Sequence, residues 1–356
     1  MNFFEKEKLT ALQAKEEAQW ITFAPFVFQA TRVLRDSGIL KTVEAHKDGI
    51  TLEDLTTKVG LPIYGVRVLV EAGLGIGLLV RSEELYKITK TSYFILHDPL
   101  TIANMDFTND VCYQALVSLD ESIATGKPQG LKVFGEWKTI YEALSTTLPD
   151  KAKKSWFAFD HFYSDYAFPE VLPLVYQHHP KSLLDIGGNT GKWSLQSFAY
   201  DPDVNITILD LPDYVETVKA ELHEKGFGKR ISFYPMDILD ELQKFPAGFD
   251  AIWMSQFLDC FSEKEIISIL KRCKQALNPE GYIYILETFW DRQRFEASAF
   301  SLQQTSLYFT VMANGNSQMY DSVVFIRCLK EAGLAIMEQK DFIGVSHTLL
   351  VCKPIQ

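Results

Sequence analysis

The strongest constraint on the fold is the alternation of short apolar runs with helical segments in the second half of the chain. The runs that we expect to be strands are 182–186, 206–210, 231–235, 250–254 and 282–287. This alternation predicts a doubly wound, Rossmann-like α/β fold with a parallel sheet. Segments 335–342 and 346–352 flank Gly344 and predict an antiparallel terminal hairpin at the edge of that sheet.

The first hundred residues have a different, mainly helical pattern. Thr51 precedes two acidic residues and marks a helix start, and Pro62 suits the first position of a helix over 63–74. Segments 78–80 and 85–88 then predict a small hairpin. Helix, turn, helix and hairpin in this order outline a winged helix.

A winged helix has two common uses, DNA binding and packing. A groove-reading helix needs several basic or amide side chains, but residues 62–75 offer only Arg67 in an apolar run. The chain carries 35 Lys and Arg against 46 Asp and Glu, a formal charge of −11 that repels nucleic acid. We therefore favour packing or dimerisation, and a transcription factor or ligand sensor is the alternative.

Composition narrows the class of protein further. Hydrophobic residues make up 47% and charged residues 23%, as in ordinary globular proteins, and no apolar run is long enough to predict a membrane span. The charged N-terminus does not resemble a secretory signal. The cysteines Cys112, Cys260, Cys273, Cys328 and Cys352 show no paired or metal-binding spacing, which predicts a reducing, cytoplasmic location and no metal site.

Two features at strand ends point to a ligand. The first strand runs into the turn Asp185-Ile-Gly-Gly-Asn-Thr-Gly191, where glycines let a ligand approach the backbone. Asp210 ends the second strand 19 residues after Gly191, a position from which an acid accepts both hydroxyls of a ribose. Together they predict an adenosine-containing ligand at the switch point of the sheet. The alternative is that Asp210 only caps the next helix.

The glycine turn is shorter than the GxGxxG of dinucleotide sites, and Asp185 would repel a phosphate there. A carboxylate at that place suits an ammonium or a sulfonium group. Met236-Asp237-Ile238 ends the third strand, and Asp237 is placed to accept the adenine amino group. The terminal hairpin occupies the place of the second half-fold that a dinucleotide needs.

Nearly the whole chain resembles the small-molecule O-methyltransferases that use S-adenosylmethionine, of the plant caffeate type and the bacterial polyketide and hydroxyneurosporene type. The matching segments are Asp185–Gly191 with the family's DxGGGxG loop, Asp210-Leu211-Pro212 with its DLP, Met236-Asp237 with its adenine segment, Phe249-Asp250-Ala251 with its fourth strand, and Asn278–Gly281 with its LxPGG-like turn. Asn189 replaces a glycine of the loop.

The resemblance implies a division of the chain into three parts: a dimerisation domain over 1–99, a helical connector and substrate lid over 100–178, and a methyltransferase domain over 179–356. The aromatic segment 155–168 belongs to the lid, or is a buried helix between domains. The family's use of S-adenosylmethionine implies the cofactor-binding residues Asp185, Gly187, Gly188, Gly191, Asp210, Leu211, Met236, Asp237, Ile238, Ser255 and Phe261. It also implies a homodimer formed through the N-terminal domain.

The chain departs from the family at the catalytic motif. The family reads LHDW or LHHF, and the aligned segment here is Leu258-Asp259-Cys260-Phe261, with Asp259 in place of the histidine. Glu287 stands for the family's acidic partner. A general base contributes about 10²–10⁴-fold, whereas alignment of donor and acceptor supplies about 7–11 kcal/mol, so losing the histidine slows methyl transfer without abolishing it.

Asp259 has two possible roles. If it faces Glu287, repulsion raises the pKa of one carboxyl and makes Asp259 a better base. Alternatively, Asp259 orients the acceptor through a hydrogen bond or binds a cationic one. We expect methyl transfer by direct displacement to an oxygen of a hydrophobic, aromatic small molecule. A family relative that keeps the cofactor for non-methylating chemistry is the alternative.

Overall fold

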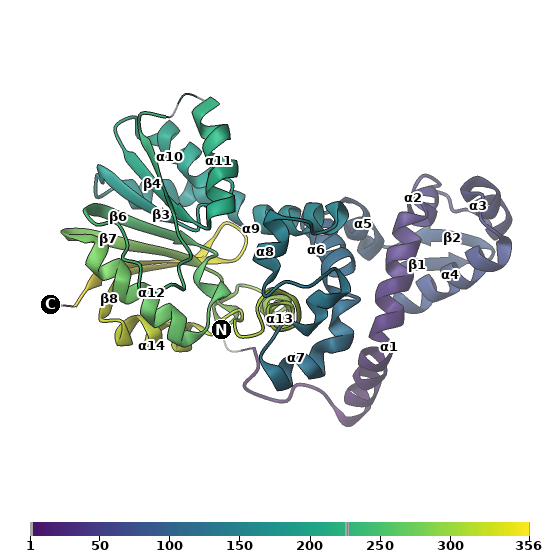
Figure 1. Ribbon diagram of the computed structural model, residues 1–356. Helices are drawn as coiled ribbons and strands as arrows, with labels where there is room; N and C mark the ends of the chain where they lie inside the picture. Colours follow the sequence, from purple (N-terminus) through teal and green to yellow (C-terminus); the bar gives the residue numbers. More distant parts are fainter. Residues whose placement is uncertain (1–2, 225, 227, 356) are drawn as a thin grey trace. The chain divides into compact units, whose positions relative to one another are not determined.

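The computed structural model describes residues 3–224, 226 and 228–355, and it divides into two compact units. One unit is Phe4–Thr108, and the other is built on the chain from Asn109 onward (Figure 1). Each unit has its own hydrophobic core. The three-part division expected from the sequence stays a prediction.

The N-terminal unit is a helical domain with one small hairpin. Its elements are α1 (Ala11–Asp36), α2 (Ile39–Glu44), α3 (Leu52–Val59), α4 (Ile63–Ile76), β1 (Leu79–Ser82), β2 (Leu85–Ile88), α5 (Lys90–His97) and α6 (Pro99–Phe107). The Thr51 side chain caps α3 by accepting the Asp54 N–H, as the sequence pattern predicts. Leu34, Leu55, Val66 and Val70 meet in the core.

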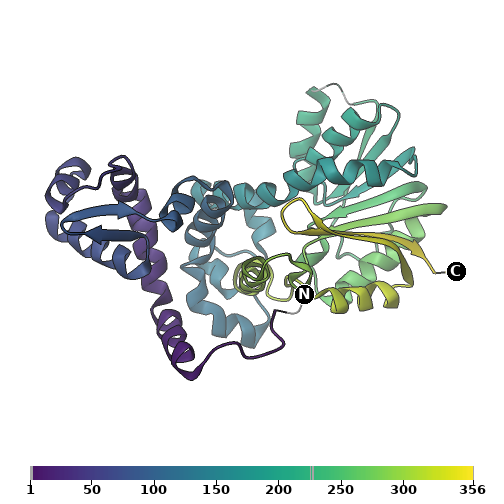
Figure 2. The same ribbon diagram turned by 180° about the vertical axis from the view of Figure 1, so that it is seen from behind.

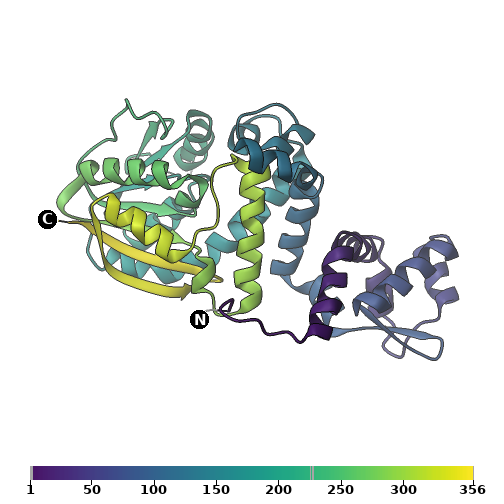
Figure 3. The same cartoon turned by 90° about the horizontal axis from the view of Figure 1, so that it is seen from below.

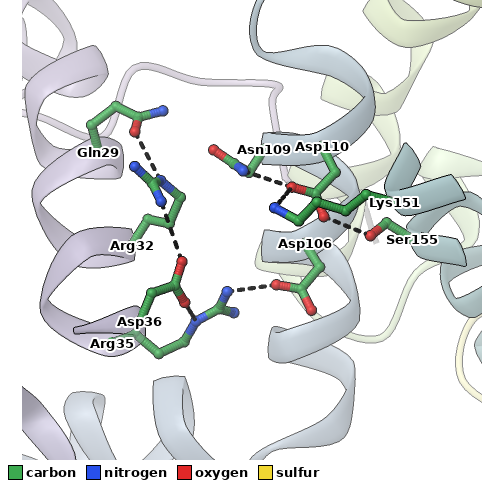
Figure 4. A network of polar contacts seen from close by, with 9 residues as sticks. All are labelled: Gln29, Arg32, Arg35, Asp36, Asp106, Asn109, Asp110, Lys151 and Ser155. Atoms are coloured by element: carbon green, nitrogen blue, oxygen red, sulfur yellow. Dashed lines mark hydrogen bonds and ion pairs between the residues drawn. The ribbon is translucent and has the colours of Figure 1, made fainter. Parts of the chain in front are cut away.

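Two arginines of α1 organise the polar side of this unit (Figure 4). Arg35 donates to Asp36 at 2.8 Å and to Asp106 at 2.5 Å, which ties the end of α1 to α6. Arg32 binds Gln29 and Asp36 on α1 itself.

In the described part of the chain, no single helix is long and apolar enough to cross a membrane, although α3 and α4 together reach that length as a pair bent by 116°.

The second unit combines helices with one mixed sheet. Its helices are α7 (Leu119–Thr125), α8 (Ile140–Ser145), α9 (Asp150–Tyr176), α10 (Lys192–Tyr200), α11 (Pro212–Glu224), α12 (Glu263–Ala276), α13 (Glu296–Tyr308) and α14 (Ser322–Glu331). Shorter helical turns are η1 (Thr108–Cys112), η2 (Ala115–Ser118), η3 (Gln129–Val133), η4 (Leu258–Cys260), η5 (Trp290–Arg292) and η6 (Phe309–Ala313). The strands are β3 (Ser182–Ile186), β4 (Asn205–Asp210), β5 (Ile231–Pro235), β6 (Phe249–Ser255), β7 (Leu277–Glu287), β8 (Leu334–Ile343) and β9 (His347–Pro354).

The strands form one sheet in the order β5-β4-β3-β6-β7-β9-β8. The pairs from β5 through β7 are parallel, and β9 runs antiparallel to both β7 and β8. The doubly wound sheet with an antiparallel terminal hairpin is therefore confirmed (Figure 2). The strand order reverses between β3 and β6, and ligands of such sheets bind beyond the carboxyl ends of the strands at that point.

Both faces of the sheet are covered. Helices α12 and α14 pack on one face, and α9, α10 and α11 pack on the other. Alternate residues of a strand serve the two cores, so Leu184 and Ile186 face α12 while Leu183 faces α9. The segment η6 continues α13 and packs against η2, η3, α7 and α8 (Figure 3).

One local expectation needs correction. The turn expected at Asn278–Gly281 lies inside β7, at the place where its pairing with β6 shifts register. After the end of α9, His179 is exposed and His178 is half-buried. Its ring stacks on Tyr282 at 3.9 Å and its Nδ1 lies 2.8 Å from the Tyr284 hydroxyl.

Candidate functional site

The glycine turn after β3 is shaped by close contacts of its backbone. Gly187 has φ +73°, and a Cβ there would lie 2.2 Å from the ring of Phe257. Gly188 is equally crowded, since a Cβ would lie 2.8 Å from Ile208. Gly191, with φ +74°, precedes the first residue of α10. Side chains at Gly187 and Gly191 would strain the backbone, so glycines keep this turn narrow.

Asp185 lies directly beneath that turn. It is 2% exposed, and its Oδ2 accepts a hydrogen bond of 2.8 Å from the Ser194 hydroxyl of α10. Burial, with a smaller contribution from the charge of Asp210, raises its pKa to about 7. A buried carboxyl with a single hydroxyl partner gains most from a nearby cation, which restores the ionised form.

Asp210 ends β4 and is held by the backbone on both oxygens. Oδ2 accepts the Asn189 N–H at 2.9 Å, and Oδ1 accepts the Leu211 N–H at 2.7 Å. Burial raises its pKa to about 6, against the effect of these two hydrogen bonds. A carboxylate oxygen can accept more than one donor, so Asp210 keeps capacity for two hydroxyl groups.

The end of β5 lies beside Asp210. The Met236 N–H donates to the Asp210 carbonyl at 2.9 Å, and Met236 and Ile238 are buried. Asp237, between them, is exposed, and its Oδ1 accepts the Leu239 N–H at 2.9 Å. The segment therefore places one exposed acid between two buried apolar side chains, which suits a flat heterocycle with a polar edge.

Beyond β6 the chain brings two aromatic rings to the glycine turn. Phe257 contacts Gly187, and Phe261 packs edge-on against Phe257 with ring centres 4.9 Å apart. The hydroxyl of Ser255, the last residue of β6, is buried and has no hydrogen-bond partner among the described residues. Buried hydroxyls in proteins are normally paired, so this one marks a place for a ligand or a water molecule.

Glu287, the last residue of β7, holds the turn η4 in place. Its Oε1 accepts the backbone N–H groups of Phe257 at 3.0 Å and Leu258 at 2.8 Å. The residue is 1% exposed, and its Oε2 has no hydrogen-bond partner in the described part of the chain. Burial and then the charge of Asp259 raise the pKa of Glu287 well above its usual range.

Asp259 lies in η4 itself. It is 5% exposed, and its Oδ1 accepts a weak hydrogen bond of 3.5 Å from the Cys260 thiol. Burial raises its pKa to about 7. A carboxyl that titrates near neutral pH can take up a proton from an acidified phenol far better than an ordinary aspartate can.

A third carboxyl, Asp160 of α9, was not predicted from the sequence. Its Oδ2 accepts a hydrogen bond of 3.2 Å from the side chain of Asn189, the residue that replaces a glycine in the turn. Burial, followed by the charges of Asp259 and Asp165, raises its pKa to about 7. The available signal was one of the two acids within the aromatic segment 155–168, together with the unusual Asn189.

Three further contacts, also not predicted, fix the elements around these acids. Asn314 donates to the Cys260 carbonyl at 2.6 Å, and Tyr320 donates to the Phe261 carbonyl at 2.7 Å. Trp156 of α9 donates to the Tyr308 hydroxyl of α13 at 2.6 Å. The first two bonds hold the C-terminal end of η4, and the third ties α9 to α13.

The residues present fit a nucleoside that carries a positive sulfur. Gly187 and Gly188 pack closely against Phe257 and Ile208, which keeps the turn free of side chains of its own, and Asp210 has hydrogen-bonding capacity for a ribose. The buried, unpartnered Ser255 hydroxyl and the buried carboxyls suit a ligand with polar and cationic groups. The fold and this edge of the sheet therefore define a nucleoside-binding α/β enzyme of the methyltransferase class.

Comparison with known families agrees. The O-methyltransferase domain family matches residues 117–335, and the Dimerisation2-like domain family matches residues 15–86. Because the first match covers more than half of the chain, the protein belongs to the O-methyltransferase domain family, whose members take their methyl group from S-adenosylmethionine.

Individual relatives are distant but span most of the chain. An L-tyrosine C(3)-methyltransferase of Streptomyces lavendulae is 21% identical over 322 residues, covering 89% of this chain and 86% of its own. The S-adenosylmethionine-dependent methyltransferase SibL has a TM-score of 0.72 at 20% identity, with 96% and 99% of the two chains covered. An O-methyltransferase from neocarzinostatin biosynthesis, solved with S-adenosylmethionine and 2-hydroxy-5-methyl naphthoic acid, has a TM-score of 0.67 at 16% identity, with 92% and 96% covered.

Proposed function

We propose that the protein transfers the methyl group of S-adenosylmethionine to an oxygen of an aromatic small molecule. The observation that carries this proposal is the edge formed by Asp185, the glycine turn and Asp210, beside the buried acids of η4 and β7. Two of the relatives named above, the L-tyrosine C(3)-methyltransferase and the neocarzinostatin O-methyltransferase, act on or were solved with an aromatic compound, and this supports an aromatic acceptor. None of these three relatives supports a DNA-binding sensor or a non-methylating enzyme.

The cofactor half of the site has three parts. Asp185 binds the ammonium group, with Gly187, Gly188 and Gly191 giving room for the methionine portion. Asp210 binds the ribose hydroxyls beside Leu211. Met236, Asp237, Ile238 and Phe261 would hold the adenine, with Asp237 as the acceptor for its amino group, and Ser255 would offer its unpartnered hydroxyl to the cofactor.

The donor supplies a methyl group on a sulfonium, which needs no further activation. The protein's own task is to align the acceptor and to remove its proton. Asp259 accepts that proton, in the position where the family carries histidine. Glu287 positions Asp259 by holding the backbone of η4, and burial makes Asp259 more basic than an ordinary aspartate.

Asp210→Ala tests the cofactor half. Two charge-assisted hydrogen bonds are lost with this side chain, so we expect the affinity for S-adenosylhomocysteine to fall at least about a hundredfold while the protein stays folded. Calorimetric titration measures the affinity, and the control is Asp240→Ala, an acid whose carboxylate accepts from the neighbouring Leu242 N–H and the Gln243 side chain. Unchanged affinity would remove the ribose assignment.

Activity is tested with radiolabelled S-adenosylmethionine and a panel of phenols, catechols and hydroxybenzoates. The expected result is label in an O-methylated product. Label bound to a ring carbon would show that the acceptor atom is carbon and not oxygen. Cofactor binding without label transfer to any compound would favour the non-methylating alternative.

We also propose that the N-terminal unit is a winged helix that forms a homodimer. The match to the Dimerisation2-like family supports this, as do apolar side chains that α1 exposes at Leu12, Trp20, Ile21, Phe23 and Phe26. Light scattering should give twice the chain mass, and the double substitution Ile21→Asp and Phe26→Asp should halve it. Lys58→Glu, on the exposed face of α3, is the control and should remain dimeric.

A cytoplasmic location is the remaining part of the proposal. All five cysteines lie in the described part of the chain as free thiols, four of them buried. Free thiols in such number persist in a reducing compartment.

A further inference from the structure

The acids on the acceptor side of the site outnumber the positive charge that faces them. Asp259 and Glu287 are almost wholly buried, and Asp160 of α9 is close enough that the charge of Asp259 raises its pKa. None of the three forms an ion pair with a lysine or arginine among the described residues. Lys192, whose charge partly lowers the pKa of Asp160, is paired with Asp165 at 2.6 Å.

The neighbouring histidine does not balance these acids either. The Nε2 of His161 is 4.0 Å from the Asp160 carboxylate, and burial followed by the charge of Lys192 lowers the pKa of that imidazole. His161 is therefore neutral at pH 7. The donor's sulfonium offsets one carboxylate at most, since its ammonium group is assigned to Asp185.

One atom points independently to a missing partner. Oε2 of Glu287 is buried beside Asp259 and lacks a hydrogen-bond partner in the described chain, although Oε1 of the same group is fully used. An unpaired buried carboxylate oxygen costs free energy, and such a cost persists at sites where a ligand supplies the missing donor.

We propose that Asp160 binds a protonated amino group of the acceptor, so that the acceptor is an amino-substituted aromatic compound. Asp160 suits this task because Asn189 holds its Oδ2 from the glycine turn, leaving Oδ1 for a ligand. Asp259 adds negative potential on the same side when ionised and stays available for the proton of the hydroxyl group. The inference rests on the proposed methyl transfer and names the chemical class of its acceptor.

The test compares amines with neutral isosteres of the same shape. The protein is saturated with S-adenosylhomocysteine and titrated with tyramine against 4-propylphenol and with dopamine against 4-propylcatechol. We expect each amine to bind about ten- to a hundredfold more tightly than its isostere, as one charge-assisted hydrogen bond provides. Asp160→Asn should equalise each pair, because its amide keeps the bond to Asn189 but loses the charge.

Glu170→Gln is the control, since it removes one negative charge from the same helix at an exposed residue that accepts the Gly344 N–H, and it should keep the preference for amines. Isosteres that bind as well as the amines, absence of binding by either amine, or a preference that survives in Asp160→Asn would each overturn the inference. Failure of the protein to bind S-adenosylhomocysteine would instead contradict the proposed function, so the two failures are distinguishable.

Discussion

Two acidic residues that lie beside or on α9, Asp110 and Asp160, differ in how many donors surround the carboxyl group and in the direction of the pKa shift. Near the start of the helix, Asp110 receives donors from Asn109, Lys151 and Ser155, each at 2.7 Å (Figure 4). Although burial opposes it, these bonds lower the pKa of Asp110. Asp160, two to three turns further along, has one amide donor and a raised pKa. The fold thus neutralises the acid that supports its architecture and leaves the acids of the candidate site uncompensated, as functional sites commonly do.

The largest effect that bears on this comparison is expected for Asp259→Asn. Removing a general base lowers the rate of methyl transfer by about 10²–10⁴-fold. In the unmodified enzyme, kcat/KM should rise with pH through about 7, where Asp259 loses its proton, and this rise should be absent from the variant. Asp259→His should shift the rise, since imidazole has a different pKa.

Steady-state rates between pH 5 and 9 measure both effects. Glu263→Gln is the control, because Glu263 binds Arg327 on the exposed side of α12. An identical pH dependence in Asp259→His and the unmodified enzyme would mean that this position takes no part in proton transfer.

The substitution Asp259→Asn should also stabilise the ligand-free protein. The folded-state pKa of Asp259 is about 7 against 3.8 unfolded, so its contribution to stability is present below pH 4 and is lost as pH rises through 7. Asp259→Asn should therefore raise the free energy of unfolding at pH 8, by up to about 4 kcal/mol, and change it little at pH 4. Denaturant titration at both pH values checks this, and a loss of stability at pH 8 would contradict the idea that the carboxylate is uncompensated.

Asp110→Asn should act with the opposite sign and a smaller magnitude. The folded-state pKa of Asp110 is lowered, so its stabilising effect is present above pH 4 and disappears as pH falls through the folded value. The substitution should cost about 1–3 kcal/mol at pH 7 and almost nothing in strong acid. If Asp110→Asn and Asp259→Asn shifted the denaturation midpoint in the same direction at pH 8, the contrast between the two regions would fail.

Local signals account for the part of the fold and site that the sequence predicts. The glycine turn, Asp210 and the terminal hairpin follow from residues adjacent in the chain, because strand ends and turns have local rules. Local signals could not identify Asp160 as a site residue. The direction of its side chain depends on the rotation of α9 about its axis, which contacts such as that of Trp156 with Tyr308 determine. The turn expected at Asn278–Gly281 was wrong because strand pairing with β6 absorbs it into β7 as an irregularity. Roles at Asp259 and Glu287 stay predictions.

The most direct test of the account is the identity of the ligand at the carboxyl edge of β3 and β4. Purified protein is titrated by calorimetry at pH 7.5 with S-adenosylhomocysteine and, separately, with NAD. The account predicts saturable binding of S-adenosylhomocysteine at one molecule per chain and no heat from NAD. Binding of NAD with no response to S-adenosylhomocysteine would contradict it.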